Sequence, residues 1–177
     1  MYDLTKIKGH LSTINKHKAV VTWLCFRCGL YKQGLLHDLS KYTPTELKTG
    51  FKYYQGFRSP IDAQKEAEGC SMSWLHHKGR NPHHWEYWLD NAKTGVCAQP
   101  MPKRYVYEMF CDRVAASMIY QKEKYTDHSA LDYYLNGRKR IMIHPETDRL
   151  ILYLLCYLSE NGLDKTCDYI RSLPKDD

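Results

Sequence analysis

Residues 7–28, IKGHLSTINKHKAVVTWLCFRC, carry the pattern from which the fold can be predicted. Apolar residues and histidines recur there at alternating steps of three and four, which is the repeat of one face of an α-helix. The residues on this face are Ile7, His10, Ile14, His17, Val21, Leu24 and Cys28. The stretch therefore predicts a long helix whose buried face carries two histidines, and Gly29 supplies its C-terminal stop.

Helical signals continue through the middle of the chain. Thr43-Pro44-Thr45-Glu46 has the form of a capping box with proline at the first helical position. Asn81-Pro82 has the form of another helix start, which would put His83 and His84 in a first helical turn. The helices predicted before the linker at residues 100–102 cover residues 34–39, from 44 onward, 60–68, 71–77 and from 82 onward.

The C-terminal half repeats the helical spacing. One helix face is formed by Tyr105, Met109, Asp112, Ala116 and Ile119. Further helices are predicted at residues 129–137, 145–161 and 163–173, and we find no alternating strand pattern and no internal repeat. The sequence thus predicts one all-α domain over residues 1–177, with its functional core at about residues 10–120 and C-terminal helices at about 129–173.

Length and composition fit this prediction. A chain of 177 residues with 43% hydrophobic and 26% charged residues is typical of one globular domain. The sequence has no apolar run of about 18 residues, and its N-terminus, MYDLTKIKGH, lacks the apolar stretch of a signal peptide. We therefore expect a cytoplasmic protein without a membrane partner.

The seven cysteines predict reduced thiols in the core. Cys25, Cys28, Cys111, Cys156 and Cys167 all fall among apolar or aromatic neighbours. The spacing of Cys25 and Cys28 would also suit a zinc site, but a structural zinc needs four ligands and no second CxxC pair is present. Core packing is the preferred interpretation.

The net charge of the chain does not by itself identify a binding partner. A formal net charge of +6 suits an anionic substrate or a nucleic acid, and it is also common for solubility alone. Because the basic residues are scattered and form no long run, a nucleic-acid partner is not favoured.

The placement of histidines and aspartates predicts a metal site. His37-Asp38, His76-His77 and His83-His84 are adjacent pairs, and His10 and His17 lie on the predicted inner helix face. Imidazoles and carboxylates are the usual ligands of divalent iron, manganese and zinc, and helices in a core hold such ligands rigidly. Any single histidine could instead be an ordinary core or surface residue.

Asp112 strengthens this prediction. A carboxylate on an apolar face costs several kcal/mol to bury unless a cation or strong hydrogen-bond donors compensate it. The same reasoning applies to Asp38. The alternative is that Asp112 pairs with Arg113 or Arg104 near the surface.

These residues resemble the HD-domain metal-dependent phosphohydrolases, whose pattern is a histidine, a later His-Asp pair and a distant aspartate. The matching residues here are His17, His37-Asp38 and Asp112. The stretch HDLSK at 37–41 is similar to the superfamily's HDxGK, and His76-His77-Lys78 is similar to the HHE of its HD-GYP branch. Residues 111–116 also resemble that branch's final aspartate motif, so the resemblance covers about residues 10–120.

Departures from that pattern limit what it implies. Ser40 replaces a glycine, Lys78 replaces a glutamate and no GYP follows, so cyclic dinucleotides are not implied as the substrate. The whole chain looks most similar to bacterial and phage proteins described only as a domain of unknown function. The stretches that carry this similarity are HDLSKY, WLHHKGRNPHHWEYW and MPKRYVYEMFCDR.

The resemblance implies an HD-type helical bundle with a metal site between its central helices. One ion would be held by His17, His37, Asp38 and Asp112, and a second by His76 and His77, with Asp38 as a bridge. The ions would be iron, manganese or zinc, and they would activate water for hydrolysis of a small phosphorylated substrate such as a nucleotide. His10 is the alternative first ligand.

Several other residues are candidates for contact with the substrate. Lys41 follows Asp38 by three residues, so on a continuing helix it would share its face and act with it in catalysis. The substrate-binding or supporting candidates are His10, Lys78, Arg80, His83, His84 and Arg113. For Lys78 and Arg80 the alternative is a solvated surface charge, and for His83 and His84 a role as metal ligands stays open.

Two other functions fit the same residues. Some HD-domain proteins are di-iron oxygenases of small molecules, and their ligands would look alike. A site that binds metal or a nucleotide without turnover is the third interpretation. The aromatic residues Trp74, Trp85, Tyr87 and Trp88 could stack on a nucleobase, although aromatics at helical spacing more often pack in a core.

Overall fold

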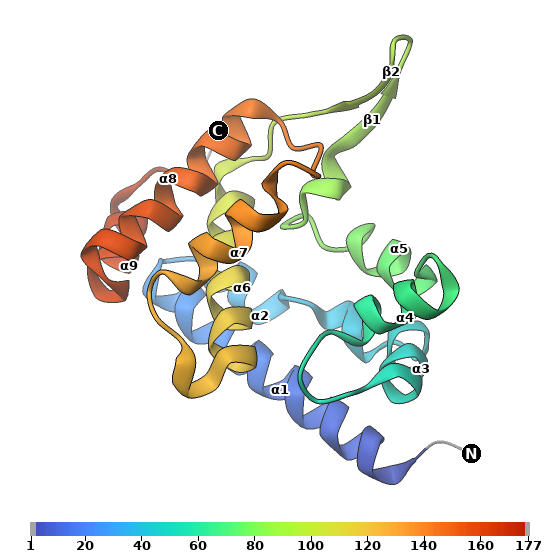
Figure 1. The fold of residues 1–177 in the computed structure, drawn as a ribbon. Helices are drawn as coiled ribbons and strands as arrows, with labels where there is room; N and C mark the ends of the chain where they lie inside the picture. The colour runs from blue at the N-terminus through green and yellow to red at the C-terminus, as the bar shows by residue number, and fades with distance from the viewer. Residues whose placement is uncertain (1–2, 176–177) are drawn as a thin grey trace.

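The structure, a computed structural model, describes residues 3–175 and is dominated by helices (Figure 1). Its elements, with η for a short 3-10 helix, follow in the order α1 (Leu4–Arg27), α2 (Tyr31–Leu36), η1 (Leu39–Tyr42), α3 (Pro44–Tyr53), α4 (Pro60–Glu68), α5 (Met72–Lys78), η2 (Trp85–Trp88), β1 (Leu89–Ala92), β2 (Gly95–Ala98), α6 (Lys103–Gln121), η3 (Lys122–Lys124), α7 (Ser129–Arg138), α8 (Pro145–Asn161) and α9 (Leu163–Ser172). The predicted helical fold class is confirmed.

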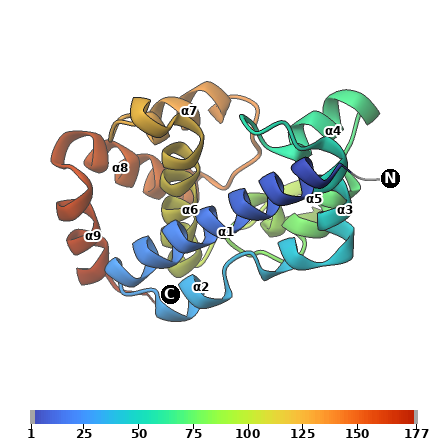
Figure 2. The same ribbon diagram turned by 90° about the horizontal axis from the view of Figure 1, so that it is seen from below.

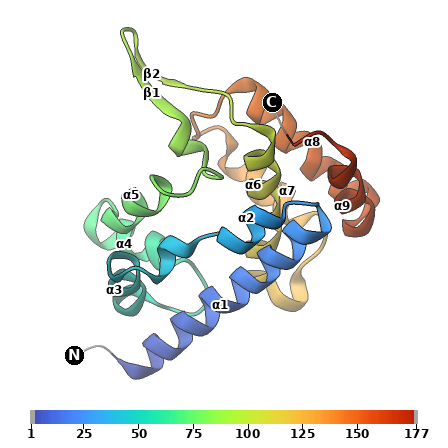
Figure 3. The ribbon, with the colours of Figure 1, turned by 180° about the vertical axis from the view of Figure 1, so that it is seen from behind.

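Helix α1 spans two groups of helices, with α3 to α5 beside its N-terminal half and α6 to α9 toward its C-terminal half (Figures 2 and 3). Asp3 caps its start by accepting a hydrogen bond from the backbone N–H of Thr5. After its end Gly29 adopts a φ of +76°, the left-handed conformation that the predicted stop requires. The predicted inner face is buried at His10, Ile14, His17, Val21 and Leu24.

The apolar core lies where α1 meets α6, α8 and α9. Its fully buried members include Val21, Leu24, Val106, Phe110, Val114, Ile151, Leu154, Leu155 and Ile170. Burying a side chain of this size stabilises the fold by about 1.5–3 kcal/mol. Cys25, Cys28, Cys111 and Cys167 are buried as free thiols, and Cys156 is partly buried, in agreement with the predicted core role.

The segment between α1 and α3 differs from its prediction. A helix was expected over residues 34–39, but α2 ends at Leu36 and Asp38 takes a left-handed backbone with φ 54°. Gly34 lies tightly against α1, where a Cβ would come within 2.9 Å of the Cβ of Cys25. Aspartate tolerates left-handed backbone better than most residues, so the chain can turn sharply at this position.

The structure corrects the prediction for residues 81–98. No strand was expected, yet β1 and β2 form an antiparallel hairpin that projects from the helices (Figure 1). The two strands, LDNA and GVCA, do not alternate apolar with polar residues, so they lack the pattern that predicts a strand. The helix expected from residue 82 is also wrong, because Asn81 donates its amide to the backbone oxygen of His77 and to Ser40 instead of capping a helix. His83 and His84 consequently lie in a turn before η2.

The C-terminal helices α7, α8 and α9 agree with the predicted segments. Helices α7 and α8 pack on α6, and α9 packs on α8 and α1 (Figure 1). Within residues 3–175, every helix is too short or too polar to cross a lipid bilayer.

Candidate metal centre

Asp38 lies at the centre of the site, with histidines on both sides of its carboxylate. The residue is only 3% exposed. Its Oδ2 lies 3.2 Å from Nε2 of His37, and its Oδ1 lies 3.3 Å from Nε2 of His77 and 3.5 Å from Nε2 of His83. The two oxygens of one carboxylate therefore face two different sets of imidazoles.

These contacts define two ligand groups that share Asp38. The first group consists of His17, His37, Asp38 and Asp112, and the second group consists of Asp38, His77, His83 and His84. Within each group the potential ligand atoms all lie within 4.8 Å of one another. Each group thus offers imidazole nitrogens and carboxylate oxygens at a spacing that a single divalent cation could use.

The first group is assembled where α1 packs against α6. Nε2 of His17, on α1, lies 2.9 Å from Oδ1 of Asp112, on α6. Nε2 of His37 lies 3.5 Å from the same oxygen. Burial would raise the pKa of Asp112, but hydrogen bonds with these two histidines hold it well below its usual range. Asp112 is therefore an anion. Its partners are His17 and His37, and not Arg113 or Arg104, the alternative partners suggested by the sequence.

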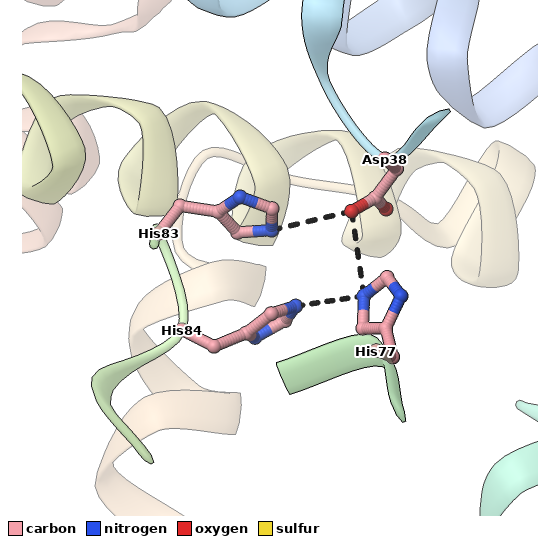
Figure 4. Close-up of side chains that lie close together, drawn as sticks. All are labelled: Asp38, His77, His83 and His84. Carbon is pink, nitrogen blue, oxygen red and sulfur yellow. Dashed lines mark hydrogen bonds and ion pairs between the residues drawn. The ribbon is translucent and has the colours of Figure 1, made fainter. Parts of the chain in front are cut away.

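The second group is assembled from the end of α5 and the turn before η2 (Figure 4). Nε2 of His84 lies 2.9 Å from Nε2 of His77, and the rings of His77 and His83 point toward the Asp38 carboxylate. Burial, together with the nearby His83 and His77, lowers the pKa of His84 well below its usual value. A neutral His84 has a free ring lone pair, which is the form that binds a metal.

Glu108 connects the two groups from behind. Its Oε1 lies 2.9 Å from Nδ1 of His37, in the first group, and 3.1 Å from Nδ1 of His83, in the second group. An imidazole that donates its Nδ1 proton to a carboxylate presents the lone pair of Nε2 on its other side. One glutamate thus orients a histidine of each group toward Asp38.

Glu46 gives similar support to His77. Its two oxygens lie 2.8 Å from Nδ1 of His76 and 2.9 Å from Nδ1 of His77. His77 therefore directs Nε2 toward Asp38. The structure does not bring His76, a predicted ligand, into either group.

Lys41 lies beside the shared aspartate, as predicted, although η1 replaces the expected continuing helix. Its Nζ is 2.6 Å from Oδ2 of Asp38. Burial would lower the pKa of Lys41, but Asp38 and Asp112 raise it above its usual value, so the ammonium group keeps its charge. The site thus contains a fixed positive charge next to its central carboxylate.

The buried polar atoms of the site fit a divalent cation. Nε2 of His37, Nε2 of His83 and Oδ1 of Asp38 are buried without a well-aligned hydrogen bond, whereas Oδ2 of Asp38 has the Lys41 ammonium as its partner. Leaving such atoms unsatisfied costs about 1–3 kcal/mol each, and more for a charged group. Coordination to a cation would satisfy all of them, and nitrogen and oxygen ligands of this kind suit iron, manganese or zinc.

The remaining predicted residues lie outside the two groups. His10 lies near Phe51, on the same face of α1 as His17 but two turns away. Lys78 is half-buried and Arg80 is exposed at the end of α5. Arg113 packs over the ring of Tyr134, with 5.0 Å from its guanidinium carbon to the ring centroid. The aromatic residues that could stack on a nucleobase differ in position. Trp85 and Trp88 pack against the core, whereas Trp74 stacks on His77.

Sequence reasoning missed the two glutamates that support the site. Glu108 precedes Asp112 by one helical turn, so its spacing could have placed it on the same inner face. Glu46 was interpreted as a capping residue, but Thr43 makes no side-chain capping hydrogen bond. For His83 and His84 the sequence left three roles open, metal ligand, supporting residue and substrate contact, because the expected helix did not predict the turn that brings them toward Asp38.

Comparison with known proteins identifies a family whose function is unknown. No curated protein and no solved structure matches the chain. A family model matches residues 6–156, which is most of the 177-residue chain. The protein therefore belongs to DUF5662, a family of unknown function.

Proposed function

We propose that this protein is a metal-dependent phosphohydrolase that acts on a small phosphoester, with nucleotides among the candidates. The observation that carries the proposal is the position of Asp38, whose two oxygens face two ligand groups while Lys41 lies 2.6 Å from one of them. The similarity of His17, His37-Asp38 and Asp112 to the HD-domain pattern supports it. The free cysteines support a cytoplasmic location.

Each part of the site has a role in this mechanism. The first and second groups would each hold one divalent cation, and Glu108 and Glu46 fix the orientation of the histidine rings. When bound, such cations lower the pKa of coordinated water toward neutrality and offset charge on phosphoryl oxygens. Lys41 places its ammonium group where it can donate hydrogen bonds to a phosphoryl oxygen, and Asp38 keeps that ammonium in position.

The positive charge of Lys41 is the feature that favours phosphate over the oxygenase alternative. An ammonium group beside the ligand groups stabilises an anionic substrate. Oxidation of a neutral small molecule does not require such a positive charge. The histidine-rich second group would suit an oxygenase equally well. The two functions therefore differ in their expected substrates more than in their ligands.

The experiment that tests the proposal is a phosphate-release assay with added manganese, iron or zinc. Purified protein is incubated with nucleotides, sugar phosphates and p-nitrophenyl phosphate, and Asp38→Ala is the control for contaminating phosphatases. We expect metal-dependent release of inorganic phosphate by the parent and none by Asp38→Ala. Absence of release with every metal, together with oxygen uptake by the iron-loaded protein, would reject the proposal in favour of the oxygenase.

A further inference from the structure

A cavity adjoins the first group, between the N-terminal half of α1, α3 and the start of α4. It has a volume of about 60 Å³. Its polar lining consists of His10, Thr13, Lys41, Glu46, Thr49, Ser59, Ser73 and Tyr120. Ile14 and Ile61 add apolar surface. The cavity therefore combines hydroxyl groups and an imidazole with a small apolar wall, and Lys41 and Glu46 add one charge of each sign.

Lys41 connects this cavity to the metal centre, because it lines the cavity and also contacts Asp38 through its Nζ. The same face of α1 continues from His17 through Ile14 to His10, a distance of about 10 Å at 1.5 Å per residue. A ligand with a phosphoryl group at Lys41 would thus extend its remaining atoms along α1 into the cavity.

His10 lines this cavity with a largely buried ring. The residue is 7% exposed, and its Nδ1 is buried without a hydrogen-bond partner. Burial, with a smaller effect of the Lys41 charge, lowers the pKa of His10 to about 4. The ring is therefore neutral near pH 7 and is suited to an uncharged hydrogen-bonding ligand.

We propose that this cavity binds the uncharged, hydroxyl-bearing part of a phosphomonoester, with His10 and Thr49 as hydrogen-bonding partners. The inference rests on the proposed function, because the phosphoryl group would be held at the metal centre. At roughly 10–15 Å³ for each water-sized site, the cavity has room for about four to six such sites. This volume fits a polyol of about three to five carbons.

Gly50 provides a test that leaves the ligand groups unchanged. It lies inside α3, and a Cβ added there would come within 2.0 Å of Nε2 of His10. Gly50→Ala must therefore displace the His10 ring. Because the cavity is the open space next to this ring, the displaced ring would enter it. Gly137→Ala is the matched control, because Gly137 lies in α7 and its added Cβ would meet no atom within 4 Å.

The experiment compares two phosphonates whose C–P bond resists hydrolysis, by calorimetric titration of the manganese-loaded protein. Methylphosphonate carries no polyol, and 3,4-dihydroxybutylphosphonate has the shape of glycerol 3-phosphate. We expect the parent and Gly137→Ala to bind the dihydroxy ligand at least about tenfold more tightly. Gly50→Ala should lose this preference while it binds methylphosphonate as the parent does. Thr49→Val, which removes one hydroxyl, should reduce the preference several-fold.

The outcomes separate the two proposals. A parent that binds both phosphonates equally, or a preference that persists in both Gly50→Ala and Thr49→Val, overturns the cavity assignment alone. A manganese-loaded parent that binds neither phosphonate overturns the cavity assignment together with the proposed function.

Discussion

At the residue scale, single side chains of the site serve both ligand groups. Asp38 serves both groups through a left-handed backbone, and Glu108 supports one histidine of each group through a single oxygen. A change at either residue should therefore affect both ligand groups together.

Replacement of Glu108 tests this dependence. Glu108→Ala should lower metal affinity by about 10- to 100-fold, the usual effect of losing a carboxylate behind a histidine ligand. Glu108→Gln keeps one acceptor oxygen and should recover part of the loss. Competition with a chromophoric chelator measures both variants, and an unchanged affinity in Glu108→Ala would show that the histidines do not need this support.

Asp112 tests the first group separately. Asp112→Asn nearly preserves shape but removes the charge, so metal affinity should fall by about tenfold or more. Because a ligand that binds only the folded state adds stability, metal should raise the melting temperature of the parent more than that of the variant. Equal metal-dependent shifts in the two proteins would place Asp112 outside the site.

At the element scale, the packing of α2 on α1 positions His37 and Asp38. Gly34→Ala would bring a Cβ to 2.9 Å from Cys25 and 3.2 Å from the backbone oxygen of Thr22. We expect a loss of about 1–3 kcal/mol in the free energy of unfolding, as for other overpacked sites. Gly137→Ala should be neutral or stabilising, because alanine has the higher helix propensity. Urea unfolding compares the two, and equal stabilities would mean that α2 can move.

The contact between α7 and α8 should make stability depend on pH. Hydrogen bonds from Arg138, opposed by burial and aided by Tyr134, lower the pKa of Asp148. The hydroxyl of Tyr134 donates to Asp148 at 2.6 Å.

A carboxyl with a depressed folded-state pKa adds stability above its unfolded pKa, near 4, and loses it as pH falls through the folded value. Asp148→Asn should therefore be less stable than the parent by about 1 kcal/mol at pH 7. The difference should shrink below pH 4. Thermal unfolding across pH 2–7 measures it, and a difference that is constant with pH would exclude Asp148 as its source.

At the scale of the whole molecule, the spacing of apolar residues predicted most helices and the inward positions of His17 and Asp112. This works because residues on one face of a helix recur every three or four positions. The spacing did not predict the turn at Asp38, the loop that carries His83 and His84, or the hairpin, since these depend on contacts between distant segments. Asn81 shows the reason: it has the sequence features of a helix cap, yet its amide bonds to Ser40, which lies 41 residues away.

The elemental content of the purified protein tests the metal centre most directly. Inductively coupled plasma mass spectrometry should find iron, manganese or zinc at more than about half an equivalent in the parent, because two ligand groups converge on one buried aspartate. Asp38→Ala should lose the metal yet keep its helical content by circular dichroism. A parent that is purified without metal and takes up none of the three ions when they are added would contradict the assignment of the site.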